Sequence, residues 1–462
     1  MIDVQIALRN LLRNWRRSLT TTLAIVIGVL ALLLFGGFTN AIMATLETGI
    51  VGSTGHIHVQ RQGFARYGFG NPAQYSIENT NEVIAVMNSD PLVASHLRVV
   101  TPLLLFNGLA GRYDAGSSHM MSGEGVEVSG QQALRTWDAY GLTHAVGGRF
   151  TLPDSPDNAA LVGVGLGRML GLCDALGIDE CPAEPASALP ADAAPIPDDI
   201  SALAQTEART PGAGEAKIDL LTSQPNGAPN VVSAQVMRAE NQGLSALDST
   251  YVAVHLDLAR KLVFGSDAAE QSTLLIAQLD STRNMAIVKD RLNTVIAEKG
   301  WPLVAVDFQQ FFAEYHQVQR MFQTIFGFIA ILMGVIVLFT VANTMSAAVL
   351  ERTAEIGTIR ALGVRPRGVR RLFLIEGSLL GLFGVAVGIA LALLCAWAVN
   401  HSGLTWVPPN RVARVPLLVS LAGDWRLIVG ASSTLLVVAM LSAWVPARRG
   451  SRRSIVEALR YA

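Results

Sequence analysis

Four long apolar runs are the clearest pattern in the chain, and they cover residues 20–41, 322–350, 372–399 and 427–445. Each run has about 19–29 residues, and at a helical rise of about 1.5 Å per residue this length crosses a hydrocarbon core about 30 Å thick. A buried helix of a large soluble protein would explain one such run. Four runs with charged flanks instead predict four transmembrane helices.

Arginines flank these runs unevenly. They crowd the segments before the first run, between the second and third, and after the fourth. Basic residues stay on the cytoplasmic side, so we expect both termini and the middle loop in the cytoplasm and segment 47–319 on the other side. The cytoplasmic set is Arg9, Arg13, Arg16, Arg17, Arg352, Arg360, Arg365, Arg367, Arg370, Arg371, Arg448, Arg449, Arg452, Arg453 and Arg460, against Arg411, Arg414 and Arg426 between the third and fourth runs.

The first 18 residues have an amphipathic helical pattern, in which the four arginines fall on one arc of a helical wheel. The pattern predicts a helix on the cytoplasmic leaflet with its basic side toward lipid phosphates. The first apolar run is longer than the roughly 7–15 residues of a cleaved signal peptide, so we interpret it as an uncleaved signal anchor. The apolar side of the helix consists of Val4, Leu8, Leu11, Leu12 and Trp15.

The segment between the first two runs is long enough for a domain with its own core. Strand patterns mix with helical patterns there, which predicts an α+β fold. The last helical pattern, residues 308–319, is expected to continue directly into the second span. Expected strands are 56–60, 251–254 and 273–277, and expected helices are 80–88, 256–263 and 285–298.

These patterns predict an α-helical membrane protein with four transmembrane helices and a mixed α+β extracytoplasmic domain inserted between helices 1 and 2. The interfacial helix and the stalk that extends the first span complete the organisation. The expected divisions are the interfacial helix (1–18), span 1 with its stalk (19–46), the outer domain (47–319) with an insertion (173–216), span 2 (320–350), a cytoplasmic loop (351–371), span 3 (372–399), a short outer loop (400–425), span 4 (426–446) and a cytoplasmic tail (447–462).

The composition agrees with a membrane protein, and the sequence lacks the motifs of several kinds of binding and catalytic site. Of the 462 residues, 51% are hydrophobic and only 15% are charged, against about 25% charged in an ordinary soluble domain. The net charge of −1 provides no uniform basic surface for nucleic acid. No Gly-Lys dipeptide occurs, which excludes a Walker A phosphate loop, and no nucleophile or paired-carboxylate motif is found. We therefore expect no catalytic site and no cofactor in this chain.

The stretch 173–216 is rich in Pro and Ala and poor in apolar residues, which predicts a flexible or partly disordered insertion. Cys173 and Cys181 lie at its start. In a compartment where disulfides persist they would close a small loop, with two unpaired thiols as the alternative. Cys395, inside the third run, is expected to act as a small apolar residue.

His56 and His58 are two residues apart in an expected strand and would therefore share one face. Two metal ligands could be placed in this way, but no Cys, Asp or Glu follows at a ligand spacing. We favour two polar residues on a solvated strand face and expect no metal site.

The most specific motif straddles the end of the second run. It comprises Asn343-Thr344-Met345, Val349-Leu350-Glu351-Arg352-Thr353, Glu355-Ile356-Gly357, Arg360-Ala361-Leu362-Gly363 and Phe373-Leu374-Ile375-Glu376-Gly377. This motif resembles the FtsX-like permease domain shared by MacB, LolC, LolE and FtsX transporters, and the beginning and the tail of the chain resemble the same family. The outer domain resembles, more weakly, the MacB-like periplasmic core of LolE-like members, from which the insertion departs.

The loop after the second run has its own helical pattern, with Ile356, Ile359 and Leu362 at neighbouring positions along its surface. Gly363 can cap this helix and Pro366 stops it. A short charged helix with apolar knobs suits docking into a partner's groove. The resemblance implies the coupling helix that sits on an ATPase, and a plain structural connector is the alternative. The expected coupling residues are Glu351, Arg352, Glu355, Ile356, Ile359, Arg360, Leu362 and Gly363.

Small and polar residues within the spans predict helix packing. Thr340, Asn343 and Thr344 could form hydrogen bonds between helices at a dimer axis or bond locally to the backbone. Glu376 would be costly deep in lipid, so we expect it at the membrane interface, paired with the arginines at 370–371. Glycines in the third run let helices approach closely, within one subunit or across a dimer: Gly377, Gly381, Gly384 and Gly388.

The resemblance implies mechanotransmission, in which ATP-driven dimerisation of two ATPase subunits moves the stalk helices and reshapes the outer domain. ATP and Mg would be bound by those subunits. Further expected partners are a second permease (homodimer or paralogous heterodimer), membrane lipid and a periplasmic adaptor or carrier. The expected place is the bacterial inner membrane, with both termini cytoplasmic and the large domain in the periplasm.

Three activities are compatible with this resemblance. The favoured one is extraction or export of a lipoprotein, lipid or other amphiphile, because the outer domain looks most LolE-like. The alternatives are a tripartite drug or peptide efflux pump, and FtsX-like signalling to an envelope enzyme without transport.

Overall fold

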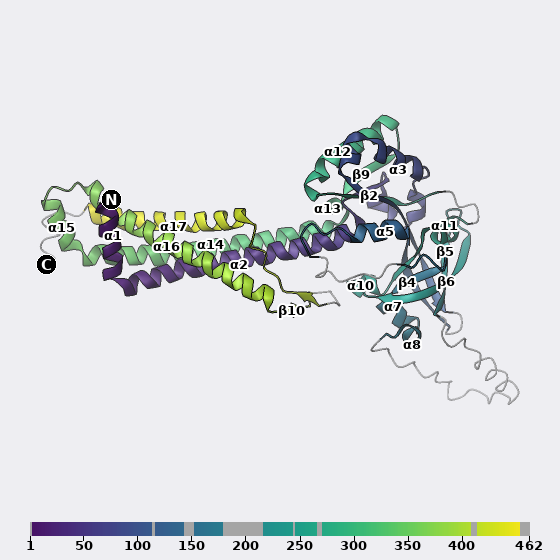
Figure 1. Ribbon diagram of the computed structural model, residues 1–462, viewed down its shortest axis with the longest axis horizontal. Coiled ribbons are helices and arrows are strands. Elements are labelled where there is room, and N and C mark those ends of the chain that lie inside the picture. Colours follow the sequence, from purple (N-terminus) through teal and green to yellow (C-terminus); the bar gives the residue numbers. More distant parts are fainter. Residues whose placement is uncertain are drawn as a thin grey trace, which may run out of the picture. The chain divides into compact units, whose positions relative to one another are not determined.

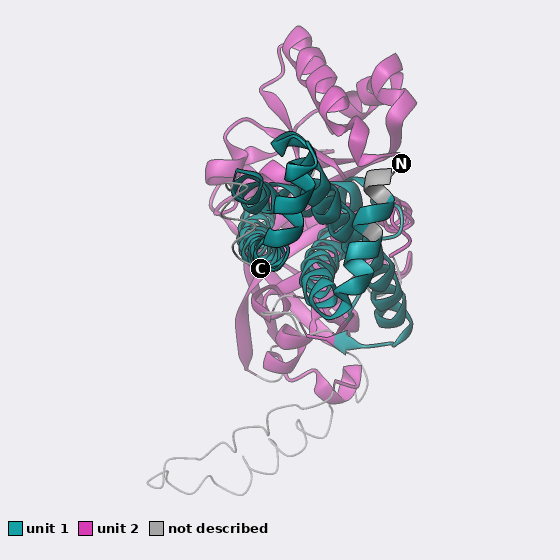
Figure 2. Cartoon of the chain, turned by 90° about the vertical axis from the view of Figure 1, so that its left-hand side faces the viewer, with its two compact units in different colours: residues 1–44, 314–405, 416–462 teal, residues 45–313, 406–415 magenta. Residues whose placement is uncertain are grey.

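The computed structural model describes residues 2–112, 116–142, 152–178, 216–243, 245–265, 270–407 and 414–452. The chain divides into two compact units (Figure 2). Unit 1 consists of residues 1–44, 314–405 and 416–462, and unit 2 consists of residues 45–313 and 406–415.

Unit 1 is built from helices (Figure 1). Four of them are long and apolar enough to cross a membrane, which confirms the four predicted apolar helices. Each extends beyond the apolar run from which it was predicted. The helices are α1 (Ile2–Arg13), α2 (Trp15–Thr54), α14 (Ala313–Glu351), α15 (Thr353–Ala361), α16 (Pro366–His401) and α17 (Trp425–Ser451), and α2, α14, α16 and α17 are the candidate spans.

The glycines of α16 pack within this one chain. A Cβ added at Gly377 would lie 2.7 Å from the Cβ of Ala443 on α17, and one at Gly388 would lie 2.7 Å from the Cβ of Val29 on α2. Gly381 likewise meets α17, and Gly384 meets α2. These contacts fit the predicted role of close helix packing within one subunit, since a larger residue at Gly377 or Gly388 would push α16 away from α17 or α2.

Two of the three polar residues of α14 form hydrogen bonds within this chain, one to another helix and one to its own backbone. Thr21 on α2 donates to the hydroxyl of Thr344 at 2.7 Å, which joins two helices of the same chain. Thr340 donates to the carbonyl of Ile336 in its own helix. Asn343 is exposed on the surface of unit 1.

Helix α1 is shorter than the predicted interfacial helix, because the helix breaks at Asn14 and Trp15 already belongs to α2. Ala7 is fully buried, and α1 packs against α16. Leu12 and Trp15, both placed on the predicted apolar side, are exposed. The side of α1 that packs in the protein is therefore centred on Ala7 rather than on these two residues.

Unit 2 contains a nine-stranded mixed sheet that partly closes on itself. Strands β2, β3, β7, β4, β6 and β5 pair in a closed ring, and β2 continues past the ring to pair with β8, followed by β1 and β9. Pairs β3–β7 and β4–β6 are parallel, and the others are antiparallel. The strands are β1 (Ile57–Arg61), β2 (Leu97–Arg112), β3 (Ser117–Val126), β4 (Ala159–Gly163), β5 (Lys217–Ser223), β6 (Pro229–Glu240), β7 (Tyr251–His255), β8 (Leu274–Leu279) and β9 (Leu303–Asp307), and β10 (Thr405–Trp406) pairs with β11 (Val415–Pro416) separately.

Helices cover both parts of this sheet (Figure 1). Helix α11 packs against the ring, whose apolar core includes Leu104, Val162 and Leu220, while α12 packs against β9. The helices of unit 2 are η1 (Phe64–Gly68), η2 (Pro72–Tyr75), α3 (Thr80–Ser89), α4 (Pro91–His96), α5 (Val128–Arg135), α7 (Val164–Met169), α8 (Cys173–Leu176), α10 (Ser245–Asp248), α11 (Leu256–Phe264), η3 (Thr282–Asn284), α12 (Met285–Lys299) and α13 (Phe308–Phe311).

The strands and helices predicted for this region are present within one or two residues of their expected bounds. The predicted helix 308–319 is interrupted, because Phe312 leaves the helical conformation between α13 and α14, but from Ala313 onward it continues into the second span as expected. Cys173 begins α8 and is disulfide-bonded. Its expected partner Cys181 and most of the predicted insertion, residues 179–215, lie outside the described residues.

Candidate functional site

The short helix α15 lies between α14 and α16 and has a well-defined end. Gly363 adopts φ +97°, and its N–H donates to the carbonyl of Arg360. The N–H of Val364 donates to the carbonyl of Ile359. These two bonds form a Schellman motif, in which a left-handed glycine satisfies the last carbonyls of a helix. Pro366 then begins α16, where its missing N–H costs nothing.

One side of α15 is anchored in an apolar cluster. Ile356 is only 6% exposed and packs with Val349, Val369, Phe373 and Ala447. The predicted row of three docking residues is therefore split, because Ile356 faces the protein interior. Its role is to hold α15 against α14, α16 and α17.

The C-terminal end of α15 and the turn after it form an exposed apolar tip, which we define as Ile359, Leu362 and Val364. Their exposed fractions are 39%, 81% and 41%. All residues from 361 to 368 are exposed, so the arginines at 365 and 367 flank the tip in solvent. Val364 was missed in the sequence, although an apolar residue between a capping glycine and an arginine was a usable signal.

A buried polar network at the start of α15 joins this helix to α1 and α16. The guanidinium of Arg352 donates to the carboxylate of Glu376 at 2.9 Å, and the side-chain amide of Asn10 donates to the same oxygen at 2.7 Å. Arg352 and Glu376 are both nearly inaccessible. The predicted pairing of Glu376 with the arginines at 370–371 is thus wrong. Its partners come from α1 and from the end of α14, and no local pattern could have identified them.

Two surface ion pairs tie the start of α15 to the beginning of the chain. Arg17 binds both carboxylate oxygens of Glu351 at 2.7 and 2.6 Å, and Arg13 binds Glu355 at 3.2 Å. Exposed pairs of this kind contribute about 0.2–1 kcal/mol each. They position α15 rather than stabilise the fold. Arg360 is half-buried.

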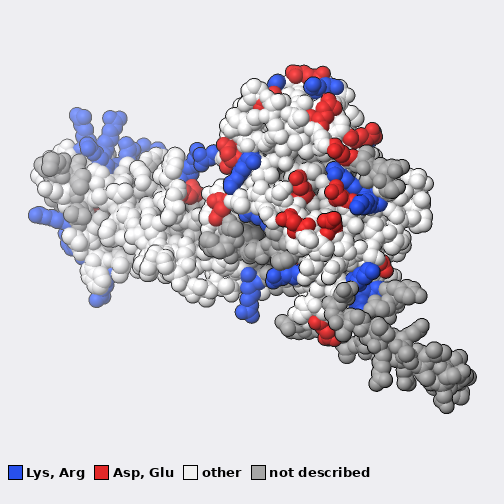
Figure 3. Space-filling view, turned by 45° about the vertical axis from the view of Figure 1, so that its right-hand side comes forward, with Lys and Arg blue, Asp and Glu red and all other residues white. Residues whose placement is uncertain are grey.

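Four of the predicted coupling residues have contacts within this chain: Glu351, Arg352, Glu355 and Ile356. The tip, in contrast, presents exposed apolar side chains that a partner could cover. Figure 3 shows the surroundings of such a site, since a broad surface over the helices of unit 1 carries no charge and basic residues gather at one end of it. Within the described residues, no group of His, Cys, Asp or Glu is placed to hold a metal ion. The arrangement suits protein docking rather than chemistry.

His58 lies in β1, and His56 directly precedes this strand. Neither histidine lies on a solvated strand face, so the prediction of such a face is wrong. His56 is 0% and His58 is 1% exposed. The ring of His56 lies edge-on to Trp137, with centroids 5.2 Å apart, and that of His58 lies edge-on to Phe311 at 4.4 Å. Burial lowers the pKa of each to about 4. It is only partly opposed by the charge of Asp280 near His56, and by the hydrogen bond to the Thr54 carbonyl and the charge of Asp307 at His58.

This burial predicts acid sensitivity of unit 2. Each folded pKa lies below the unfolded value of about 6.5, so stability is full above about pH 6.5 and falls as pH drops toward 4, by on the order of 3 kcal/mol per histidine. Hydrogen exchange of β1 and β8 peptides in the detergent-solubilised full chain, corrected for the intrinsic pH effect, should accelerate across this window. His58→Gln should flatten the profile, whereas the control His119→Gln, at a site bonded to the Met169 carbonyl, should not. An unchanged profile in His58→Gln would refute the assignment.

Comparison with known proteins locates the site in a family. Residues 327–455 match the FtsX-like permease C-terminal domain. The chain is 32% identical over 120 residues to an uncharacterized ABC transporter permease, MJ1507, of Methanocaldococcus jannaschii, covering 26% of this chain and 28% of the relative. It is 33% identical over 133 residues to the lipoprotein-releasing system transmembrane protein LolC of Neisseria meningitidis (27% and 31%). It is 34% identical over 140 residues to the macrolide export ATP-binding/permease protein MacB of Escherichia coli (30% and 19%).

The resemblance inferred from the sequence is thereby confirmed for the part of the chain that contains α15, α16 and α17. Each alignment spans less than a third of the relative's own length. Unit 2 lies outside the matched family domain, and its LolE-like character stays a prediction.

Proposed function

We propose that this chain, whose residues 327–455 are an FtsX-like permease domain, is the permease subunit of an ABC transporter. In this proposal α15 docks on a separate ATPase subunit, two copies of which bind ATP and Mg. The observation that carries the proposal is the exposed apolar tip of α15 on an ion-paired base inside the matched domain. A second permease, identical or paralogous, completes the transporter.

The membrane assignment rests on the four candidate spans and on the arginines at their ends. We place the chain in the bacterial inner membrane, with α15 and both termini in the cytoplasm. Unit 2, the α+β domain between spans 1 and 2, then lies in the periplasm. In this proposal an ATPase docked in the cytoplasm acts on unit 2 through α2, whose last residues belong to unit 2.

An amphiphilic substrate is the class that unit 2 supports best. Four apolar residues lie opposite one another on adjacent strands of its closed ring: Met120 opposite Leu109, Leu109 opposite Leu221, and Leu221 opposite Val231. Met120 is 76% exposed, and Leu109 and Val231 are also exposed. Leu221 between them is half-buried, so the row exposes apolar surface on four adjacent strands, and contiguous exposed apolar surface is typical of binding sites. It suits the acyl chain of a lipoprotein or lipid.

The proposal as a whole is tested by purifying the complex. The permease, tagged and solubilised in mild detergent, should co-purify with an ABC ATPase encoded in the same organism. Mass spectrometry of the complex should then detect a bound lipid or acylated protein. If no ATPase co-purifies, the permease assignment fails, and a bound non-amphiphilic drug or peptide would replace the substrate class.

Topology gives a separate prediction. A cysteine at the exposed position Ser245 in unit 2 should react with a membrane-impermeant thiol reagent in intact spheroplasts. A cysteine at the exposed Thr358 on α15 should react only after the membrane is opened. Both sites are accessible in the fold, so a difference reports the side of the membrane. Labelling of Thr358→Cys from outside would reverse the orientation.

A further inference from the structure

Helix α2 ends in unit 2 on side chains that come from two neighbouring strands. The amide of Gln278 on β8 donates to the carbonyl of Val51 at 3.0 Å, and Nε2 of His58 on β1 donates to the carbonyl of Thr54 at 2.5 Å. Carbonyls in the last turn of a helix have no partner within the helix. Here the ring of His58 supplies a partner for Thr54, while the Val51 carbonyl accepts from the N–H of Gly55 at 3.0 Å as well as from Gln278. Gly55, at φ +69°, turns the chain directly into β1.

A second set of bonds holds α2 one to two turns earlier. The carboxylate of Glu47 accepts from the hydroxyl of Thr282 at 2.5 Å and from the hydroxyl of Tyr140 at 3.0 Å. Nε2 of His56 lies 3.1 Å from the same Thr282 oxygen, and Nδ1 of His56 accepts from the N–H of Leu279 at 3.0 Å. Because Nδ1 accepts a hydrogen bond, the neutral ring carries its proton on Nε2. Nε2 therefore donates a hydrogen bond to the Thr282 hydroxyl, and this hydroxyl donates one to Glu47.

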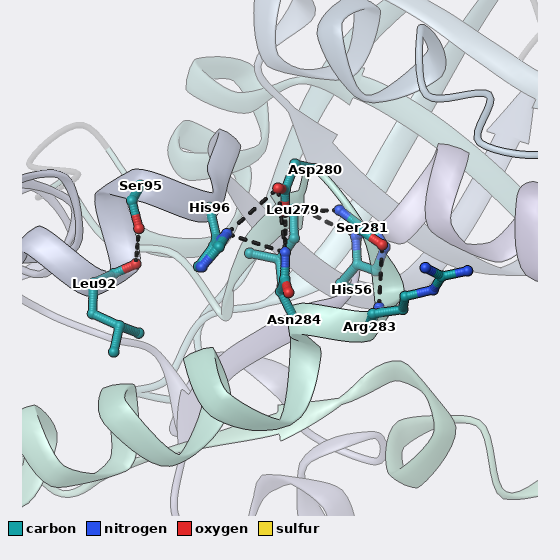
Figure 4. Close-up of polar contacts among 9 residues, drawn as sticks. All are labelled: His56, Leu92, Ser95, His96, Leu279, Asp280, Ser281, Arg283 and Asn284. Atoms are coloured by element: carbon teal, nitrogen blue, oxygen red, sulfur yellow. Dashed lines mark hydrogen bonds and ion pairs between the residues drawn. The ribbon is translucent and has the colours of Figure 1, made fainter.

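We call Glu47, His56, His58, Gln278 and Thr282 the stalk clamp. All but the half-buried Thr282 are buried. Strands β1 and β8 are antiparallel neighbours, with Ile57 opposite Ala277, so the clamp grips both strands at one end of their pairing. Figure 4 shows His56 reaching the Leu279 backbone, beside the Asp280, His96 and Asn284 contacts that fix the same turn after β8.

The chemistry of the clamp distinguishes it from ordinary packing. Apolar contact is non-directional and would let the helix end slide or rotate over the sheet. Hydrogen bonds from fixed side chains to particular carbonyls set both the axial position and the rotation of the helix. Leaving such a buried group unpaired is costly, so the helix end and the strands must move together.

We propose that the stalk clamp passes displacement of α2 into strands β1 and β8, so that its members are positioning residues for coupling. This inference rests on the proposed function, because it requires an ATPase that moves α2. The hydrogen bonds of the clamp link the last turns of α2 to β1, to β8 and to η3, which closely follows β8.

The test uses the full chain in complex with its ATPase, reconstituted in lipid nanodiscs, with ATP plus vanadate as the probe. Hydrogen exchange of peptides covering β1 and β8 is compared with and without nucleotide. We expect a nucleotide-dependent change in the wild type. Gln278→Leu removes the bonds to the Val51 and Leu134 carbonyls, and Thr282→Val removes those to Glu47 and His56. In each variant the change should shrink about tenfold or more, because two hydrogen bonds are lost. ATPase co-purification should be unaffected.

Two controls separate coupling from folding. Thr282→Ser keeps the hydroxyl and should restore the response. Ser53→Ala removes a hydroxyl that bonds only within α2, to the carbonyls of Gly49 and Ile50, and should respond like the wild type. If Gln278→Leu does not fold, comparison of Thr282→Val with Thr282→Ser still tests whether the clamp couples α2 to β1 and β8.

The outcomes are distinguishable. If the ATPase binds and β1 and β8 respond to nucleotide in Thr282→Val as in the wild type, the clamp inference is overturned while the proposed function stands. If no ATPase binds the wild type, the proposed function fails and the clamp inference fails with it. Loss of the response in Ser53→Ala would also overturn it, because a general weakening of α2 would then explain the effect.

Discussion

Leu362→Asp should abolish association between the permease and its ATPase. Leu362 is 81% exposed at the end of α15, so in the docking proposal it becomes buried only when an ATPase groove covers it. An unpaired carboxylate in that groove costs several kcal/mol. Each 1.4 kcal/mol weakens binding about tenfold, so affinity should fall by orders of magnitude. Pull-down of the ATPase by the tagged permease from solubilised membranes measures the loss.

The controls follow from the exposure of the tip. Leu362→Met keeps an apolar side chain of similar volume and should retain binding. Ile359→Asp, at the less exposed second position of the tip, should also lose binding. Insertion and the level of protein in the membrane should be normal in all three variants, because the tip contributes little to the core. Full complex formation and activity in both aspartate variants would show that α15 is not the docking element.

Glu376→Ala should be the most destabilising single change near the site. It leaves the guanidinium of Arg352 buried without its carboxylate and also removes the acceptor of Asn10. Breaking one side of a buried pair costs about 3–5 kcal/mol. We expect a clear drop in the melting temperature of the detergent-solubilised protein and loss of ATPase co-purification, since α15 depends on this network for its position.

A double variant tests whether the unpaired buried charge causes the stability loss in Glu376→Ala. In Arg352→Met with Glu376→Met both charges are replaced by apolar groups, which is often neutral for stability, so most of the lost melting temperature should return. Glu355→Ala, which removes an exposed partner of Arg13, should cost less than about 1 kcal/mol. A double variant no more stable than Glu376→Ala would mean that the network is not what the single change disrupts.

Local sequence patterns were sufficient for the spans and for part of the secondary structure of unit 2, whereas β2, β3, β5, β6 and β9 were not predicted. The four apolar helices, the strands at 251–255 and 274–279 and the helices at 80–89 and 285–299 follow from repeats of two or about 3.6 residues, which a few neighbouring positions define. The end of α15 at Gly363 is equally local, because the left-handed turn needs a residue without a Cβ. The permease domain was recognised from a motif that is continuous in sequence.

Only the tertiary structure decided what each side chain meets. Ile356 belongs to the core and Leu362 to the surface because α14, α16 and α17 close over one side of α15, although both residues fit the same helical pattern. Glu376 pairs with Arg352 and Asn10, the latter 366 residues away along the chain. His56 and His58 alternate like residues of a solvated strand, yet α2 and the aromatic rings of Trp137 and Phe311 bury them. A periodic pattern specifies an element and its faces, whereas burial and pairing depend on which distant segments fold against those faces.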